Sequence, residues 1–179
     1  MGGVGFIATI IILALVMIDL DLHPQYLALI FLFLGFAGIG LIDDLLKIVR
    51  KQNQGLTFWQ KIFAQSGIAL IFAMVMVLLG HNLTLAGALA KIGFVNPFLY
   101  QLLAVVIIIG AANATNLTDG LNGLLAGTAG AAFFFLAFVA IKLQVPEAAI
   151  FALICSGATL AFLYFNFPKA KVFMGDAGS

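Results

Sequence analysis

Long apolar runs alternate with short polar breaks along this chain. Six runs of the length that a bilayer core requires from a helix lie near residues 2–18, 26–42, 62–80, 98–112, 121–141 and 148–166. Runs such as "FIATIIILALVMI" (6–18) show no alternation of apolar and polar residues, which argues against the strands of a membrane barrel. The pattern therefore predicts an all-helical, polytopic membrane protein with a single transmembrane domain over residues 1–179.

The composition supports this prediction. Hydrophobic residues make up 64% of the 179 residues and charged residues only 8%, whereas a typical soluble domain is about a quarter charged. The one cysteine, Cys155, lies inside the last apolar run, so no disulfide can form within the chain. We interpret it as a small packing residue.

The basic residues predict the orientation of the spans. If the first span runs outward, one face receives six of them: Lys47, Arg50, Lys51, Lys61, Lys169 and Lys171. Lys91 and Lys142 then lie on the opposite face, where His23 and His81 are interpreted as solvated loop residues. The positive-inside rule makes the six-residue face cytoplasmic.

Four of the seven acidic residues are expected on this same face: Asp43, Asp44, Asp119 and Asp176. The neighbours Asp43 and Asp44 fall in the C-terminal half of a predicted helix, where mutual repulsion and the helix dipole disfavour both carboxylates. Positive groups must therefore compensate. A solvated charge cluster with Lys47, Arg50 and Lys51 is one explanation of the pair.

The segment "NATNLTDGLNG" (113–123) is more polar than a turn requires. Thr118 or Asp119 is predicted as the N-cap of the fifth helix. Capping does not account for Asn113, Asn116 and Asn122, because polar groups beside hydrocarbon need a cavity or a partner. On this prediction Asn122 lies on the same helical face as Asp119, and both residues could bind one ligand.

Asp176 lies in the sharply polar segment "VFMGDAGS" (172–179), where Gly175 and Gly178 permit unusual backbone angles. A plain turn aspartate is the simplest interpretation, and Pro168 is predicted to end the helix that contains Asn166. Four acids on one face nevertheless suit Mg²⁺, which binds through carboxylates and substrate phosphates. Zinc is disfavoured, because that face has no cysteine or histidine.

Four blocks carry a resemblance to a known family: "MGG", "GLIDDLLKIVRKQNQGLTFWQK", "NATNLTDGLNGL" and "FNFPKAKVFMGDAGS". In content and order they resemble the polyprenyl-phosphate N-acetylhexosamine-1-phosphate transferases. The basic insert "KIVRKQNQ" and "NLTDGL" are more similar to the phospho-N-acetylmuramoyl-pentapeptide transferase branch. The resemblance implies Mg²⁺-dependent transfer of phospho-MurNAc-pentapeptide from its UDP-linked form to undecaprenyl phosphate. The products, lipid I and UMP, would form at the inner face of the bacterial cytoplasmic membrane during peptidoglycan synthesis, with no nucleic acid as a partner.

The resemblance also implies roles for individual residues. Asp176 matches the Mg²⁺-binding aspartate, Asp43 and Asp44 match an acidic pair assigned to catalysis, phosphate handling or metal, and Asp119 matches a third essential acid. The predicted substrate-binding residues are Asn113, Asn116, Asn122, Asn166 and Lys51.

Two positions depart from the family pattern. Asn122 stands where the family usually has an aspartate linked to the nucleotide pocket, and Gln54 stands where many members have lysine. Members also carry a basic segment before "MGG", and a histidine-rich loop with further helices after "MGDAGS". The chain is therefore expected to be an internal fragment of the enzyme, inactive by itself.

Two other functions stay open at this point. One keeps the fold and mechanism but uses UDP-GlcNAc as the donor. The other is an ion-coupled transporter, which requires acids near the middle of the membrane and favours an internal repeat. The sequence leaves open the peptide stem of the donor and the choice between a monomer and a homodimer.

Overall fold

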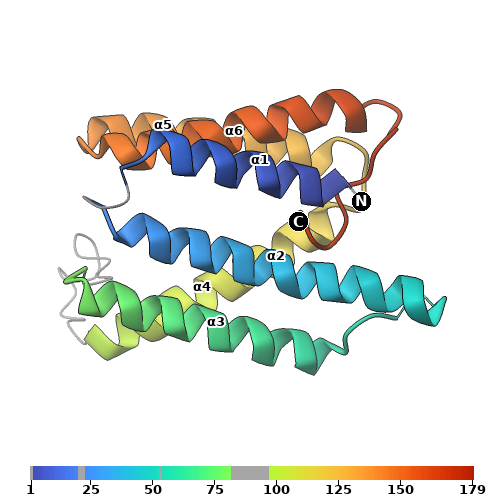
Figure 1. Cartoon of the computed structure of the whole chain (residues 1–179), viewed down its shortest axis with the longest axis horizontal. Helices are drawn as coiled ribbons and strands as arrows, with labels where there is room; N and C mark the ends of the chain where they lie inside the picture. Colours follow the sequence, from blue (N-terminus) through green and yellow to red (C-terminus); the bar gives the residue numbers. More distant parts are fainter. Residues whose placement is uncertain (1, 20–22, 53, 82–96) are drawn as a thin grey trace.

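A computed structural model of the chain describes residues 2–19, 23–52, 54–81 and 97–179 (Figure 1). Its helices are α1 (Gly2–Met17), α2 (Gln25–Arg50), α3 (Phe58–Leu78), α4 (Pro97–Thr118), α5 (Leu124–Lys142) and α6 (Pro146–Asn166). No strand is present within the described ranges, so the prediction of an all-helical protein is confirmed. Lys91, predicted on the outer face, lies outside the described residues.

The helices have the properties of membrane spans. Five of them, α2 to α6, are long and apolar enough to cross a bilayer, whereas the apolar α1 has only 16 residues. Large apolar side chains such as Phe63 on α3 and Phe135 on α5 are exposed on the outer faces of the helices. Apolar surface of this extent is typical of contact with lipid. The chain is a polytopic membrane protein, as predicted.

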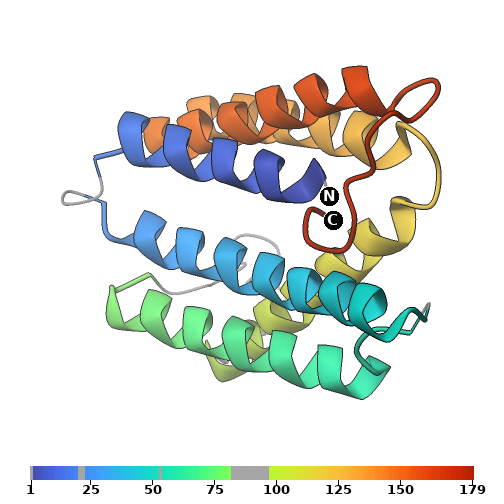
Figure 2. The same cartoon turned by 45° about the vertical axis from the view of Figure 1, so that its right-hand side comes forward.

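The helices form two groups that face each other (Figure 1, Figure 2). One group contains α1, α5 and α6, and the other contains α2, α3 and α4. α4 crosses obliquely from the side of α3 toward α5 and so links the two groups. Between them, Ile10 and Ala14 of α1 pack with Ile30 of α2 and with Ile154 and Cys155 of α6. The burial of Cys155 in this core agrees with a packing role.

α2 continues to Arg50, beyond the apolar run predicted to end at residue 42. Asp43 and Asp44 therefore lie within the helix, in its C-terminal half as predicted. The helix tolerates them because Lys47, one turn later, pairs with both carboxylates.

α4 likewise continues past residue 112 to Thr118 and includes Asn113 and Asn116. Its polar side chains find acceptors in the preceding turn. Thr115 donates to the Ala111 carbonyl and Thr118 to the Ala114 carbonyl. Local bonds of this kind allow polar residues to stay within a membrane helix.

The predicted cap of the fifth helix is wrong. α5 begins at Leu124, and its N-cap is Gly123, with φ of 77°. Thr118 is the last residue of α4, and Asp119 lies in the turn between the helices. Asn122 is in the same turn, so it does not share a helical face with Asp119.

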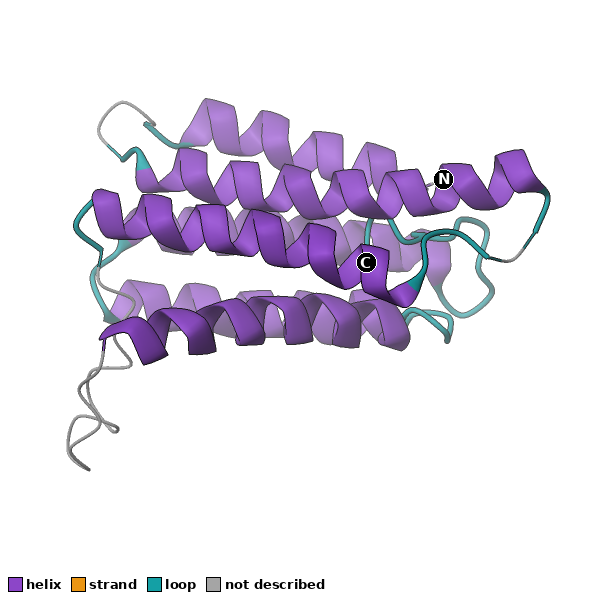
Figure 3. Cartoon of the chain, turned by 90° about the horizontal axis from the view of Figure 1, so that it is seen from below, coloured by secondary structure: helices purple, strands orange, loops and turns teal. Residues whose placement is uncertain are grey.

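One end of the bundle gathers the polar elements. The C-terminal ends of α2, α4 and α6 lie there, together with the N-terminal ends of α1, α3 and α5 (Figure 1, Figure 3). The segment 167–179 folds back over this end, because α6 ends at Asn166, two residues before Pro168. The four acids that were predicted to share one face do share this end.

Candidate active site at one end of the helix bundle

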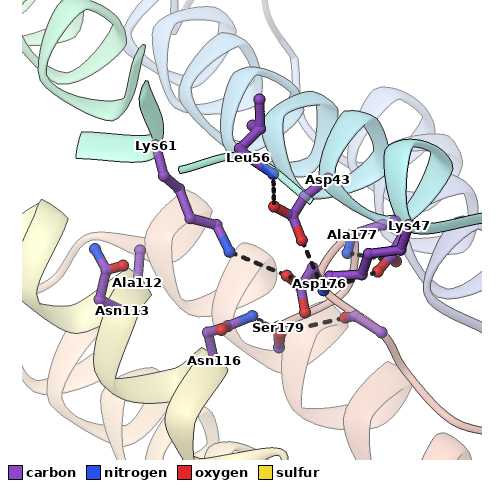
Figure 4. Close-up of polar contacts among 12 residues, drawn as sticks. Asp43, Lys47, Leu56, Lys61, Ala112, Asn113, Asn116, Asp176, Ala177 and Ser179 are labelled. Carbon is purple, nitrogen blue, oxygen red and sulfur yellow. Dashed lines mark hydrogen bonds and ion pairs between the residues drawn. The ribbon is translucent and has the colours of Figure 1, made fainter. Parts of the chain in front are cut away.

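Three carboxylates converge between α2 and the segment 167–179 (Figure 4). Asp43, Asp44 and Asp176 each offer an oxygen atom, and these atoms lie within 4.8 Å of one another. Asp43 is buried, while Asp44 and Asp176 are half-buried. In the described part of the chain, these acids form a group compact enough to hold a metal ion.

Backbone N–H groups orient two of these carboxylates. The Leu56 N–H donates to Oδ1 of Asp43 at 2.8 Å, and the Ala177 N–H donates to Oδ2 of Asp44 at 3.4 Å. Oδ2 of Asp43 and Oδ1 of Asp44 then face Lys47. These backbone hydrogen bonds therefore fix the orientation of both carboxylates.

Gly175 permits the close approach of the segment 167–179 to α2. Its φ of 75° lies in the left-handed region that favours glycine. A β-carbon at this position would also lie 2.7 Å from Oδ2 of Asp44. The prediction of an unusual backbone angle at Gly175 is thus confirmed.

Two lysines neutralise the carboxylates. Nζ of Lys47 lies 2.7 Å from Asp43, 3.0 Å from Asp176 and 3.9 Å from Asp44. Nζ of Lys61 lies 3.0 Å from Oδ2 of Asp176. The compensating charge predicted for the aspartate pair is therefore present in Lys47, whereas Lys61, on a different helix, pairs with Asp176.

The other basic residues of the predicted charge cluster lie elsewhere. Arg50 donates to the Gly55 carbonyl at 3.3 Å. Lys51 is exposed in a left-handed turn with φ of 51°, where its backbone N–H caps α2. The structure thus places Lys51 at the rim of this end and not among the acids.

Lys61 is a site residue that sequence reasoning missed. A capping box starts α3: Gln60 N–H donates to the Thr57 hydroxyl, and Thr57 N–H donates to the Gln60 side chain. This cap places Lys61 in the first turn of α3, facing Asp176. The "LTFWQ" pattern signals the cap, but no local pattern signals a partner 115 residues away.

The pKa values of two site carboxyl groups are shifted in opposite directions: that of Asp176 is lowered and that of Asp119 is raised. Burial by itself would raise the pKa of the Asp176 carboxyl, but hydrogen bonds with Asp43, Lys61, Lys47 and Asn116 hold it well below its usual range. Burial raises the pKa of Asp119, and the charges of Asp176 and Asp44 add to this effect, against a hydrogen bond from the Gly175 backbone. Asp119 therefore lies beside the acid group and senses its charge.

The asparagines of α4 face the neighbouring elements. Asn116 donates to Oγ of Ser179 at 2.9 Å and contacts Asp176 (Figure 4). Asn113 lies one turn earlier and donates both to Oε1 of Gln65 and to the Ile109 carbonyl, each at 2.8 Å. Of the two, Asn116 belongs to the acid group, and Asn113 joins α4 to α3.

The other two asparagines hold the segment after α6. Asn166 is buried, accepts from the Gly123 N–H at 2.6 Å and donates to the Val172 carbonyl at 3.0 Å. Asn122 is exposed, and its amide lies 3.4 Å from the Pro168 carbonyl. In the structure both contact the segment 167–172, which follows α6, and not the three carboxylates.

Three cavities border the acid group. A groove of about 530 Å³ is lined by Asp43, Lys47, Arg50, Lys61 and Asp176, among others. A second, of about 540 Å³, runs along Asp44, Lys47, Lys171 and Gly175. A smaller pocket of about 120 Å³ extends between α2, α3 and α4 and combines Phe33 and Phe36 with Lys61 and Asp176.

This arrangement fits a hard divalent cation. Carboxylate oxygens are the ligands that Mg²⁺ prefers, and a group of oxygens without sulfur or imidazole does not favour zinc. The ammonium group of Lys47 already stands in for a cation among the three inward-facing oxygens. The lysines and the grooves beside them suit an anionic substrate.

The chain is similar to known proteins over its whole length. The model of the glycosyl transferase family 4 matches residues 26–179, which include all four acids of the site. Three similar proteins bear the name phospho-N-acetylmuramoyl-pentapeptide-transferase. They come from Shouchella clausii (42% identical), Oceanobacillus iheyensis (42%) and Bacillus subtilis (40%). Each comparison covers 100% of this chain and 56% of the relative, so the chain spans little more than half the length of these relatives. Since the family model covers most of its length, the chain belongs to the glycosyl transferase family 4.

Proposed function

We propose that this chain forms the catalytic end of a phospho-N-acetylmuramoyl-pentapeptide transferase. The reaction transfers phospho-MurNAc-pentapeptide from its UDP-linked form to undecaprenyl phosphate and yields lipid I and UMP. One observation carries the proposal: Asp43, Asp44 and Asp176 converge with Lys47 and Lys61 at one end of an apolar bundle. The names of the relatives give the substrate class.

Asp176 would hold Mg²⁺, together with Asp43 or Asp44. When bound, the ion neutralises charge on the diphosphate and stabilises UMP as the leaving group. A phosphate oxygen of the acceptor attacks the sugar-bearing phosphorus of the donor, and the bond from that phosphorus to UMP breaks. The ammonium groups of Lys47 and Lys61 bind phosphate oxygens in the groove of about 530 Å³ and orient them for attack.

The acceptor needs little help to become a nucleophile. The second pKa of a phosphate monoester is about 6, so much of the acceptor is already a dianion at neutral pH. Asp119, with its raised pKa, is the acid of the site best suited to exchange a proton with the acceptor phosphate. This role is secondary, because the ionised acceptor reacts without a base.

The position of the site suits a lipid-borne acceptor. The three carboxylates lie at the end of helices whose outer faces are apolar, where a phosphate at the membrane surface can reach them. Six basic residues at the same end support an orientation toward the cytoplasm, in a bacterial inner membrane. The clustering of the acids at one end gives no support to an ion-coupled transporter.

The identity of the donor sugar is tested with two nucleotide sugars. Asn122, which replaces the usual aspartate, keeps UDP-GlcNAc as an alternative donor. UMP release is measured from UDP-MurNAc-pentapeptide and from UDP-GlcNAc, with undecaprenyl phosphate, Mg²⁺ and the full-length protein in detergent. Release from the muramoyl donor alone supports the proposal. Release from UDP-GlcNAc alone would assign the protein to the sister branch.

A further inference from the structure

We propose that Lys47 is a tethered cation that occupies the metal position when no metal is bound and leaves it when a divalent cation enters. This inference rests on the proposed Mg²⁺ dependence. It assigns to one side chain two successive partners: first the carboxylates, then the phosphate groups of the substrate. Metal and substrate binding are thereby coupled through Lys47.

The position of the ammonium group carries the first step. A lysine four residues after an aspartate on a helix commonly pairs with that aspartate alone. Nζ of Lys47 instead lies between Asp43, Asp44 and Asp176, at 2.7, 3.9 and 3.0 Å. Two of these acids share α2 with Lys47, but Asp176 comes from a segment 129 residues away. Lys47 therefore holds the two parts of the acid group together.

The oxygens that Lys47 contacts are the ones a metal needs. Oδ1 of Asp43 and Oδ2 of Asp44 are engaged by backbone N–H groups, so their other oxygens are the free ligands. These, with Oδ2 of Asp176, are the oxygens that face Lys47. Mg²⁺ binds oxygen at about 2.0 to 2.1 Å, which leaves no room for an ammonium group at the same point. The two cations therefore exclude each other.

Space for the displaced ammonium group of Lys47 is available in the neighbouring grooves. Its side chain is 34% exposed, compared with 18% for Lys61. Lys47 also borders both large grooves, the one along Arg50 and Lys61 and the one along Lys171. A rotation of its flexible side chain brings the ammonium group into either groove, where it meets an anionic substrate. Lys61 contacts only one of the three acids, through the same Oδ2 of Asp176, and an oxygen can accept from one lysine while it binds a metal ion.

The first test measures Mn²⁺ affinity by the electron paramagnetic resonance signal of free Mn²⁺, using the full-length protein in detergent without nucleotide. Lys47→Met removes the competing charge and keeps a side chain of similar length. We expect it to bind Mn²⁺ about tenfold more tightly than the wild type. A positive charge at this distance lowers the pKa of a carboxyl group by about 1 to 3, and tenfold corresponds to the lower end of that effect. Lys169→Met, which removes an exposed lysine at the same end, is the matched control and should change the affinity less than twofold.

The second test needs no variant and so does not depend on folding of Lys47→Met. Wild-type protein is treated with an amine-acetylating reagent with and without Mg²⁺, and modification is read by peptide mass spectrometry. Mg²⁺ should increase the labelling of Lys47 at least about threefold, because the ammonium group is released from its carboxylates. Labelling of Lys169 should stay unchanged.

Equal or weaker Mn²⁺ binding by Lys47→Met, or labelling of Lys47 that Mg²⁺ does not raise, would overturn the exchange. Lys47 would then be a permanent counter-ion. Failure of both the wild type and the variant to bind Mn²⁺ would instead overturn the metal site of the proposed function, and the exchange with it. The two failures are therefore distinguishable.

Discussion

Gly40 of α2 lies against the main chain of Asp176, so close that a β-carbon at position 40 would overlap the Asp176 carbonyl group. Gly40 is buried and lies one turn before Asp43 and Asp44. The absence of a side chain here lets the segment 167–179 approach α2 closely enough for the acids to meet. A glycine in a helix thus sets the geometry of the site.

Gly40→Ala should therefore displace Asp176. We expect a loss of about 1 to 3 kcal/mol in the free energy of unfolding, as for other overpacked sites. The rate of UMP release should also fall about 100-fold, because Asp176 is displaced from its position in the site. Gly38→Ala is the matched control, because nothing lies within 4 Å of a β-carbon at that position. It should leave activity unchanged and stabilise α2 slightly. Equal effects of the two substitutions would contradict this role of Gly40.

The hydrogen bond between Gln65 and Asn113 should be a measurable link between α3 and α4. Gln65 is buried, and its Oε1 accepts from Asn113 at 2.8 Å, one turn from Lys61 on α3 and from Asn116 on α4. In a double-mutant cycle of Gln65→Leu and Asn113→Ala, thermal unfolding should give a coupling energy of about 0.6 to 1.7 kcal/mol, between the mean and the maximum for bonds between membrane helices. Additive effects of the two substitutions would show that the bond contributes no stability.

Asn166 should matter for stability more than its neighbour in space, Asn122. Asn166→Leu leaves the Gly123 N–H and the Val172 carbonyl without their partners. Buried groups of this kind cost about 1 to 3 kcal/mol each when unsatisfied. Asn122→Ala removes only an exposed contact at 3.4 Å and should change the free energy of unfolding by less than about 0.5 kcal/mol. Chemical unfolding of both variants compares them, and a larger cost for Asn122→Ala would contradict the assignment.

Acid should destabilise the protein through Asp176. The pKa of this carboxyl is lower in the folded protein than in the unfolded chain, where it is close to the usual value of about 4. Its ionised form therefore stabilises the fold above that pH, and the contribution is lost as the pH falls further. The midpoint of thermal unfolding, measured with a chelator present, should drop more steeply below about pH 4 for the wild type than for Asp176→Asn. Parallel curves would exclude Asp176 as the source.

Much of the fold could be predicted from the sequence, because long apolar runs predict membrane helices. The prediction failed where polar residues extend a helix. α2 and α4 continue through Asp43 and Asn113 because Lys47 and Gln65 satisfy these side chains. The cap of α5 depends on Asn166, which lies 43 residues from Gly123. Contacts over such distances leave no local pattern.

The candidate site could be predicted in outline. Placing acids at helix ends on one face was enough to group Asp43, Asp44 and Asp176, and the structure brings them together. The same reasoning gave no weight to Lys61, because only the fold places it beside Asp176. It also grouped Asn166 and Asn122 with the acids, whereas the structure shows both in contact with the segment that follows α6. The roles of these residues in substrate binding stay predictions.

The most direct measurement is UMP release by the full-length protein from UDP-MurNAc-pentapeptide and undecaprenyl phosphate. Release should stop when a chelator removes divalent cations and return with Mg²⁺. Asp176→Ala should lower the rate at least about 100-fold. Asp19→Asn should leave it unchanged, because Asp19 follows α1, whose C-terminal end lies opposite the acid group. Release that persists in the chelator, or in a folded Asp176→Ala variant, would contradict the claim that this acid group is a metal-dependent transferase site.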